Sequence, residues 1–278
     1  MLSQLGDEAK VLAGGQSLIP LMKLRFANPQ HLVDLNFVPN TSYIQDAGSV
    51  LRFGAMTRHA EIEDSAAVRS VPILHDCAAG IADVQVRNRG TIGGSIAEAD
   101  PSGDWATVLL TQETQVWCIG PSGKRSIPLS DFIKDAYTTS LAQDELVEEI
   151  AVSKPPSGTG SAYLAFKRAA PVYPTASVAI QLTLQGDSCK DVAIALGCVG
   201  LTAVRASRAE QELRGQTIND RTIDRAADAV QTEGDPQGDM RGSAEYKRKL
   251  LGGLLKRAIG TAVRRARGEQ VETSHIYA

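Results

Sequence analysis

Short apolar or alternating segments separated by turn residues recur along the first half of the chain, and this pattern predicts a mixture of strands and helices. The predicted strands are Lys10–Ala13, His31–Leu35, Val50–Gly54, Thr114–Ile119 and Leu146–Val152. Predicted helices begin near Met56 and cover Val71–Ala82 and Trp105–Leu110. A further helical turn is expected after Ser17, which would cap it, with Leu18, Leu21 and Met22 on one face.

The composition changes abruptly at Ser153–Gly160, where prolines and glycines interrupt the apolar pattern. We therefore expect a domain boundary there, between a first domain over residues 1–155 and a second over residues 160–278. In the second domain, apolar runs predict paired strands at Ser177–Gln185 and Val192–Gly197. Helices are predicted over Arg205–Leu213, Asp220–Gln231 and Ser243–Arg267.

The last predicted helix carries many lysines and arginines, so its function has two interpretations. Basic amphipathic helices bind nucleic acids or membranes. An apolar stripe instead favours a helix that docks on the core and exposes its basic face to solvent. The stripe consists of Tyr246, Leu250, Leu254, Leu255, Ile259 and Val263. The formal charge of the whole chain is −3, so we expect no nucleic-acid partner.

The overall composition is typical of a globular protein, since 43% of the 278 residues are hydrophobic and 22% are charged. No apolar run reaches the roughly 20 residues needed to cross a bilayer, and the first residues lack the features of a signal peptide. The cysteines form no CxxC pair, which argues against a local zinc or iron–sulfur site. They are Cys77, Cys118, Cys189 and Cys198. We expect reduced thiols in a cytoplasmic protein.

Isolated polar residues form no catalytic or metal-binding pattern. No histidine has a second ligand at metal spacing, and we interpret each as structural or exposed. They are His31, His59, His75 and His275. No nucleophile elbow or catalytic cysteine signature occurs. Asp100 and Asp104 leave two interpretations open, because they could cap the start of a helix or accept hydrogen bonds from ribose hydroxyls.

Two glycine-rich stretches, Ala13–Ser17 and Arg87–Ser95, are the strongest candidates for a ligand site. Neither matches the motif of Rossmann folds or of P-loops, and each could be a plain turn. Alternatively, glycines with positive φ could arrange backbone N–H groups into a concave nest for phosphate oxygens. Thr91 and Ser95 would add hydroxyl donors. These residues support the hypothesis that one diphosphate is held between the two stretches.

The sequences AGGQSL at Ala13–Leu18 and TIGGS at Thr91–Ser95 resemble those of FAD-binding medium subunits of molybdenum hydroxylases, the carbon monoxide dehydrogenase and xanthine dehydrogenase family. The resemblance covers nearly the whole chain, through MTRHAEIE, VRNRGTIGGS, ADPSGDW, DAYTTSL, YLAFKRAA, IALGCVGLTAVRA and GSAEYKRKL. It implies an α+β fold. A two-lobed FAD-binding domain of the vanillyl-alcohol-oxidase type would be followed by a small C-terminal domain, in which helices pack on an antiparallel sheet.

The resemblance also implies which residues bind FAD. Both glycine stretches would contact the cofactor, chiefly its diphosphate, through Ala13, Gly14, Gly15, Gln16, Ser17, Leu18, Thr91, Ile92, Gly93, Gly94 and Ser95. By position, Asp104 and Lys167 would lie near the flavin nucleotide. Val147 would line the cofactor, and Tyr173 would lie near the isoalloxazine ring.

The chain departs from the family pattern in three places. Pro171–Val172 replace a Gly-Asp type of sequence, and Glu98 stands where relatives often have histidine. Relatives usually carry a longer lead before the first glycine stretch, with an additional strand and helix, whereas twelve residues precede Ala13 here. We expect the loss of that packing to expose core surface and to weaken flavin binding.

The resemblance implies an electron-transfer subunit without catalytic residues of its own, because the flavin carries the redox chemistry. Electrons would come from [2Fe–2S] clusters on a small partner subunit, which receives them from a large molybdopterin-binding subunit, and would leave FAD for an external acceptor. The expected assembly is a dimer of heterotrimers. Two alternatives remain, a stand-alone flavin oxidase that acts on a small alcohol and an assembly or scaffold subunit that has lost its flavin.

Overall fold

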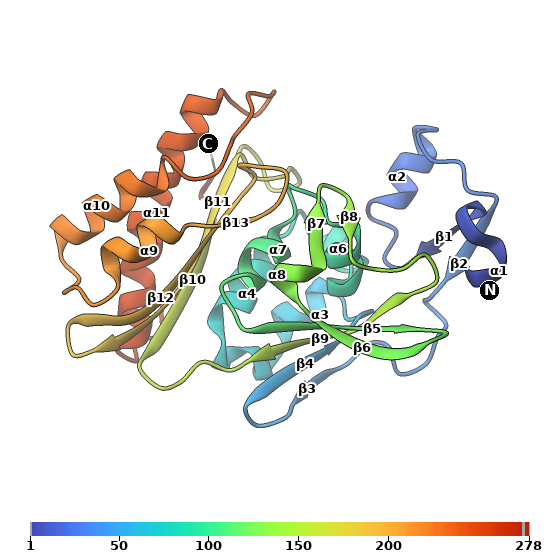
Figure 1. Cartoon of the computed structure of the whole chain (residues 1–278), viewed down its shortest axis with the longest axis horizontal. Coiled ribbons are helices and arrows are strands. Elements are labelled where there is room, and N and C mark those ends of the chain that lie inside the picture. The colour runs from blue at the N-terminus through green and yellow to red at the C-terminus, as the bar shows by residue number, and fades with distance from the viewer. Residues whose placement is uncertain (1, 274–275, 278) are drawn as a thin grey trace.

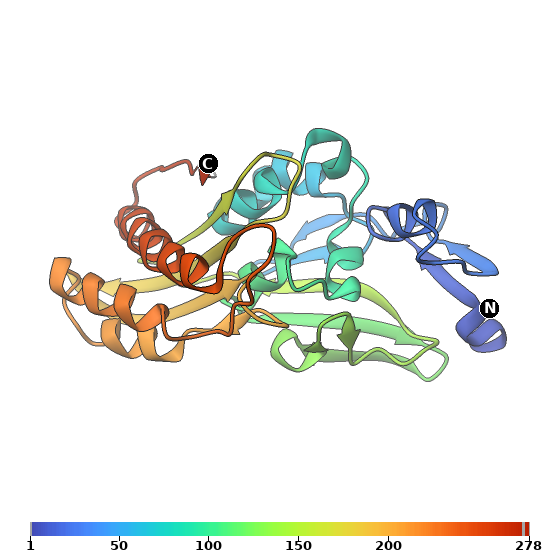
Figure 2. The same cartoon turned by 90° about the horizontal axis from the view of Figure 1, so that it is seen from above.

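The computed structural model describes residues 2–273 and 276–277. Three parts follow one another along the long axis of the molecule: an N-terminal lobe, a central lobe and a C-terminal domain (Figure 1). The N-terminal lobe lies at one end of the body, in both the side view and the view from above (Figure 2).

The N-terminal lobe is small and sparsely packed. It contains α1 (Leu2–Leu5), a 3₁₀ turn η1 (Gly6–Glu8), β1 (Ala9–Leu12), α2 (Leu18–Lys23) and β2 (His31–Asp34), and β1 pairs with β2 in parallel. The two strands and the short helix occur where the sequence predicted them. Ser17 does precede α2, but its side chain makes no capping hydrogen bond, so that part of the prediction is wrong. No residue of α2 is buried, and the expected apolar face lies partly in solvent.

The central lobe contains a five-stranded antiparallel sheet in the order β3-β4-β9-β5-β6. Its strands are β3 (Ile44–Asp46), β4 (Val50–Gly54), β9 (Leu146–Ser153), β5 (Thr114–Gly120) and β6 (Gly123–Pro128). The accompanying helices are α3 (His59–Asp64), η2 (Ala66–Ser70), α4 (Pro72–Gly80), α5 (Val84–Arg87), α6 (Ile92–Glu98), α7 (Asp104–Leu109) and α8 (Leu129–Phe132). A small hairpin, β7 (Ile133–Asp135) and β8 (Thr138–Thr139), follows α8. The three strands and the helices predicted in this region are present within a few residues.

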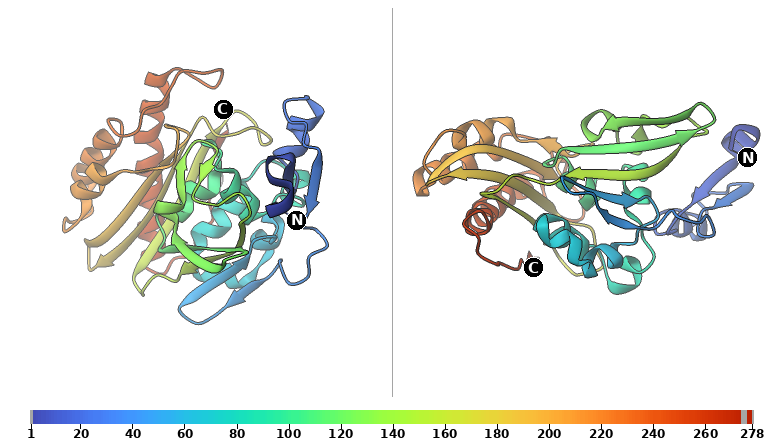
Figure 3. Two further views of the ribbon diagram at one scale, coloured as in Figure 1. Left: turned by 45° about the vertical axis from the view of Figure 1, so that its right-hand side comes forward. Right: turned by 90° about the horizontal axis from the view of Figure 1, so that it is seen from below.

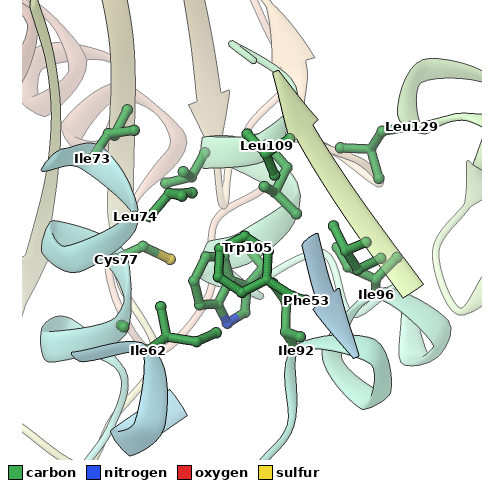
Figure 4. Packing of buried hydrophobic residues seen from close by; sticks show 14 of the residues in the cluster. Phe53, Ile62, Ile73, Leu74, Cys77, Ile92, Ile96, Trp105, Leu109 and Leu129 are labelled. Atoms are coloured by element: carbon green, nitrogen blue, oxygen red, sulfur yellow. The ribbon is translucent and has the colours of Figure 1, made fainter. Parts of the chain in front are cut away.

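The core of the central lobe forms around Trp105, which is fully buried on α7 (Figure 4). Leu74 and Cys77 approach it from α4, and Phe53 approaches it from β4 (Figure 4). The core therefore joins the sheet to the helices that also form the walls of the candidate site.

The C-terminal domain contains a five-stranded sheet in the order β13-β12-β11-β10-β14. The strands are β10 (Thr159–Lys167), β11 (Ala176–Gln185), β12 (Ser188–Gly197), β13 (Val204–Arg205) and β14 (Ile276–Tyr277). The helices α9 (Ser207–Leu213), α10 (Asp220–Val230) and α11 (Ala244–Ala266) lie at the positions predicted from sequence. The paired strands β11 and β12 confirm the prediction, whereas β10 was not predicted.

The sheet of the C-terminal domain is covered on both faces. On one face it meets α4 and α7 of the central lobe, and on the other it meets α11 (Figure 3). Alternate residues of β10 accordingly belong to different cores, since Tyr163 and Ala165 join the central core while Ala162 and Leu164 join the core beneath α11. The central and C-terminal parts thus share a continuous packed interface.

The long helix α11 docks on the sheet, as its apolar stripe predicted. Leu254, Leu255 and Ile259 are buried, but Tyr246 is 43% exposed and is not part of the buried core. The basic face is also not wholly solvated. Lys247 is buried, with its ammonium 2.8 Å from the carbonyl oxygen of Gln237.

Candidate cofactor-binding site

A cleft of about 290 Å³ lies where the three parts of the molecule meet. The N-terminal lobe contributes Val11, Ala13, Gly14, Gly15, Gln16, Ser17 and Leu18. The central lobe contributes His59, Ile81, Ala82, Val86, Gly90, Thr91, Gly94, Ser95, Glu98, Asp100, Gly103 and Asp104. The C-terminal domain contributes Lys167, Pro171, Val172 and Tyr173. Ligand pockets are commonly found at such junctions, with volumes of about 300 Å³ upward.

The two glycine stretches meet in this cleft, as the sequence predicted. Gly14 packs so closely on the backbone of the second stretch that a Cβ atom there would lie 2.7 Å from the Cα atom of Gly90. A Cβ atom on Gly94 would lie 3.5 Å from the Cβ atom of Ala13. Segments separated by more than seventy positions in sequence therefore form one continuous wall.

The first stretch presents unpaired backbone donors at this wall. Within the described part of the chain, the N–H groups of Gly14, Gly15, Gln16 and Ser17 have no acceptor. Gly15 has a φ of 73°, which glycine tolerates better than other residues. The stretch leads directly into α2, whose dipole adds positive potential at its start. Such a set of donors suits the oxygens of a phosphate.

The second stretch does not form the expected nest, and this prediction is corrected. Residues 92–98 form the helix α6, in which Gly93 and Gly94 have ordinary negative φ. The N–H groups are already used. Ile92 donates to the Thr57 carbonyl at 3.0 Å, Gly93 to the Ala55 carbonyl at 2.9 Å, and Gly94 to the Thr91 hydroxyl at 3.2 Å. The glycine at position 93 is needed for packing, because a Cβ atom there would lie 2.5 Å from that of Ala55.

Three of the expected FAD-binding residues lie in the core rather than in the lining of the cleft. Ile92 is fully buried against the central core, and Gly93 is packed on the β4 side of α6. Val147 lies on β9 with its side chain in the same core. Their spacing alone could not reveal this, since the side that a residue presents depends on the helical or extended state of its backbone.

The floor of the cleft carries a buried polar cluster of Lys167, Asp104 and Tyr163. Lys167 is 1% exposed and donates a hydrogen bond to the carbonyl oxygen of Gly80, with its Nζ atom 3.9 Å from Oδ1 of Asp104. The Tyr163 hydroxyl donates to the same Oδ1 atom at 2.6 Å. Burial, followed by the charge of Asp104, raises the pKa of Tyr163 well above its usual value. The tyrosine is therefore a neutral donor that fixes the orientation of the carboxylate.

Asp104 and Asp100 both line the cleft but make different contacts. Asp104 is the first residue of α7, where a carboxylate interacts favourably with the helix dipole, and it also lines the cleft. Asp100 accepts a hydrogen bond from the backbone N–H of Ser102 at 2.8 Å. Of the two interpretations left open from sequence, capping is wrong for Asp104, because Gly103 is the N-cap of α7 and no side chain caps it. The place of Asp104 in the lining of the cleft leaves the ribose interpretation as a prediction.

Tyr173 lies at the mouth of the cleft, with 48% of its surface exposed. The guanidinium of Arg241 lies over its ring at 6.0 Å from the ring centre. Partial burial and the nearby carboxylate of Asp100 raise the pKa of Tyr173, so its hydroxyl is neutral at physiological pH. Burial, and then the charge of Asp100, also raises the pKa of Glu98.

Several lining residues were not predicted from sequence, and His59 is the most notable. It was interpreted as an isolated histidine, yet it is almost fully buried at the cleft beside Gly90. The sequence feature that could have indicated a role for His59 in the site is its position in MTRHAEIE, at the start of a predicted helix. His31 and His75 do not line this cleft, and His275 lies outside the described residues. In the described part of the chain no cluster of His, Cys, Asp or Glu could hold a metal ion.

Comparison with known proteins now identifies the family. Residues 1–155 match the FAD-binding domain of molybdopterin dehydrogenases, and residues 161–262 match the C-terminal domain of CO dehydrogenase flavoproteins. The chain belongs to this flavoprotein family. The expectation of a FAD-binding medium subunit of the molybdenum hydroxylase type is confirmed, and so is the expected two-part α+β fold.

Curated relatives of the flavoprotein are similar over most of their length. The carbon monoxide dehydrogenase medium chain of Hydrogenophaga pseudoflava is 40% identical over 94% of this chain and 92% of its own length. The 6-hydroxypseudooxynicotine dehydrogenase complex subunit alpha of Paenarthrobacter nicotinovorans is 36% identical over 99% of this chain and 94% of its own.

Solved structures of relatives have the same fold. The carbon monoxide dehydrogenase of Hydrogenophaga pseudoflava that lacks the Mo-pyranopterin moiety superposes with a TM-score of 0.92 at 41% identity, over 95% of this chain and 92% of its own. Quinoline 2-oxidoreductase from Pseudomonas putida 86 superposes with a TM-score of 0.90 at 32% identity, over 95% of this chain and 92% of its own. Relatives that share this fold therefore carry names that refer to different substrates, carbon monoxide and quinoline.

The lining of the cleft suits the diphosphate of FAD. Unpaired N–H groups at Gly14–Ser17 are suited to bind a diphosphate, and the absence of side chains at Gly14 and Gly90 lets the two backbones approach each other closely at this wall. The buried ammonium of Lys167 adds a positive charge at the floor. Among the described helices, none combines the length and apolar character required to cross a membrane.

Proposed function

We propose that this flavoprotein is the electron-transfer subunit of a molybdopterin-containing hydroxylase or dehydrogenase, with FAD held in the cleft between its lobes. Bound FAD would supply two-electron and one-electron redox chemistry between partner [2Fe–2S] clusters and an external acceptor. The observation that carries the proposal is the meeting of the two glycine stretches, with unpaired donors on one of them. The role of this chain is to bind, orient and shield the cofactor.

Within this proposal each part of the cleft has a role. The diphosphate would be bound by the backbone of Ala13–Leu18 and by the hydroxyl groups of Thr91 and Ser95 across the cleft. Asp104 and Lys167 would contact the flavin nucleotide from the floor. Tyr173 would cover the isoalloxazine ring at the mouth, where Arg241 steadies it.

The proposed assembly contains a large molybdopterin-binding subunit and a small [2Fe–2S] subunit, arranged as a dimer of heterotrimers. Relatives named medium chains or medium subunits support a multi-subunit complex. We place the complex in the cytoplasm, in keeping with four free cysteines, three of them buried. The proposed division of the chain is an FAD-binding domain over 1–155 and a C-terminal domain over 160–278, which the Pro- and Gly-rich segment before β10 supports.

Flavin titration of the purified full chain tests the proposal. We expect one FAD per chain, with a resolved flavin absorbance spectrum and quenched flavin fluorescence. A chain that remains colourless after incubation with FAD would instead favour the scaffold alternative. Turnover of small alcohols by the isolated chain would favour the stand-alone oxidase, whereas the proposed subunit hydroxylates nothing without its partners.

A further inference from the structure

His59 is a buried polar side chain at the wall of the cleft. It is the first residue of α3 and is 5% exposed. Gly90 lies against its ring, since a Cβ atom on Gly90 would be 2.7 Å from Nε2 of His59. Gly14 in turn lies against Gly90, so Gly90 is in contact with both His59 and the first glycine stretch.

The neighbours of His59 determine where its proton lies. The indole N–H of Trp105 donates to Nδ1 of His59 at 3.1 Å. An indole nitrogen can only donate, so Nδ1 must be the unprotonated acceptor. Burial, with a smaller contribution from the positive charge of Arg87, lowers the pKa of His59 to about 4. At neutral pH the ring is uncharged and its single N–H is therefore at Nε2.

This Nε2–H group has no hydrogen-bond acceptor among the described residues. The Nε2 atom is also not among the fully buried unpaired side-chain atoms, so it remains accessible from the cleft. His59 is one of the residues that line the cleft. Its donor consequently faces the space that a ligand would fill.

We propose that the Nε2–H group of His59 donates a hydrogen bond to a phosphoryl oxygen of the dinucleotide bound in this cleft. The inference rests on the proposed function, because it requires FAD to occupy the cleft. The diphosphate is the favoured acceptor because the unpaired N–H groups of Gly14–Ser17 lie on the same wall, across Gly90 from the ring. Trp105 acts on the cofactor through His59 and is a positioning residue, because its N–H holds the imidazole in the donating tautomer.

A neutral donor suits this position better than a cation. A charged imidazolium buried here would have to be desolvated beside Arg87, whose guanidinium is paired with Glu63 at 2.7 Å. The neutral ring donates a directional hydrogen bond without the cost of desolvating a charge. Hydrogen bonds to ionised acceptors are also stronger than those between neutral groups.

Two measurements on the full-length chain test the inference. The first is the two-bond ¹H–¹⁵N histidine spectrum at neutral pH, with and without FAD. We expect the free chain to show a neutral His59 with its proton on Nε2, and we expect that N–H resonance to shift when FAD binds. A proton on Nδ1 would overturn the inference whether or not FAD is present.

The second measurement is the dissociation constant of FAD and of ADP for three variants. His59→Leu, which lacks the donor, should weaken both ligands about tenfold or more. His59→Gln, which keeps an N–H at a similar reach, should stay within about threefold of wild type. Trp105→Phe retains the imidazole but loses the N–H that selects its tautomer, so it should weaken both ligands less than His59→Leu does and should move part of the histidine proton to Nδ1 in the spectrum.

The outcomes separate the two proposals. Equal affinity of wild type and His59→Leu for FAD would overturn the role of His59 while leaving the flavoprotein assignment intact. A loss seen with FAD but not with ADP would overturn the assignment of the acceptor to the diphosphate. A wild-type chain that binds no FAD would overturn the proposed function and this inference with it. Should His59→Leu fail to fold, the Gln variant and the spectrum still decide the matter.

Discussion

Lys167 brings a full positive charge to a position that is 1% exposed, with one carbonyl and one carboxylate for partners. Removing that charge leaves the buried Asp104 carboxylate with the Tyr163 hydroxyl as its hydrogen-bond donor. Breaking a buried pair from one side typically costs about 3–5 kcal/mol, because the remaining charge is uncompensated. The residue therefore serves stability as well as the proposed cofactor contact.

The Lys167→Met variant should show both effects. We expect the free energy of unfolding of the cofactor-free chain to fall by about 3 kcal/mol and the affinity for FAD to fall at least tenfold. Urea unfolding and flavin fluorescence titration measure the two quantities. Lys249→Met is the matched control, since Lys249 is an exposed residue of α11 paired with Glu245, and it should change neither. Unchanged FAD affinity in Lys167→Met would remove Lys167 from the site.

His59 should also make stability depend on pH. Its pKa is about 4 in the folded chain and about 6.5 when unfolded, so the unfolded chain takes up a proton first as the pH falls. This contribution is complete above pH 6.5, declines below it and is lost by pH 4. Between about pH 7 and pH 5 the loss amounts to about 2 kcal/mol. Urea unfolding at both pH values should show that His59→Gln loses correspondingly less stability; an identical pH dependence in the variant would refute the assignment.

At the scale of elements, the junction of β1 and α2 depends on the absence of a side chain at Gly14. A methyl group there would collide with the Arg89–Gly90 backbone, which cannot give way without separating the two glycine stretches. Gly14→Ala should therefore weaken FAD binding by at least tenfold. In contrast, Gly253 lies in α11 with open space around it, and Gly253→Ala should stabilise the helix by about 0.5–1 kcal/mol. Calorimetry and FAD titration of both variants check the pair; wild-type affinity in Gly14→Ala would show that the close contact is dispensable.

Local patterns predicted most elements because their apolar spacing matched their final environment. The helix α11 and the hairpin β11–β12 are clear examples, each with a side that faces a core. The strand β10 was missed because both of its faces are buried, which makes its sequence continuously apolar instead of alternating. The helix α6 was missed because two adjacent glycines read as a turn, whereas tertiary contacts with Ala55 and Thr57 stabilise the helical start.

The candidate site was predictable only in part, for a similar reason. The backbone donors at Ala13–Leu18 and the residues Asp104, Lys167 and Tyr173 line the cleft as expected. The contribution of His59 could not be read from the sequence, because it depends on Trp105, which is distant in sequence and adjacent only in the fold.

For the molecule as a whole, the central lobe and the C-terminal domain are joined by a buried ion pair. The guanidinium of Arg265 on α11 donates to both carboxylate oxygens of Asp76 on α4, at 2.6 and 2.9 Å, and also to the carbonyl of Ser161 at 2.7 Å. The side chains are 7% and 1% exposed. The pair therefore fixes the long helix of one domain to a helix of the other.

Arg265→Met should destabilise the chain by about 3–5 kcal/mol, because it removes the guanidinium that is paired with the buried Asp76 carboxylate. The double variant Arg265→Met with Asp76→Asn should recover part of that loss, since the uncharged amide can still accept the Tyr163 N–H. Arg267→Met, which breaks only the exposed contact with Asp187, is the matched control. Urea unfolding gives the values, and a single variant as stable as wild type would show that this ion pair contributes nothing to the stability of the interface.

The N-terminal lobe has little packing of its own: over residues 2–40, only Ala9, Gly14 and Gly15 are buried. A ligand that contacts both this lobe and the rest of the molecule would stabilise the docked lobe. At a free concentration one hundred times its dissociation constant, the stabilisation would be about 2.7 kcal/mol. Trypsin should consequently cut after Lys23 or Arg25 in the free chain and far more slowly once FAD is bound. In a living cell, the same dependence would make flavin loading a quality-control step, with unloaded copies removed by proteases before they enter a complex.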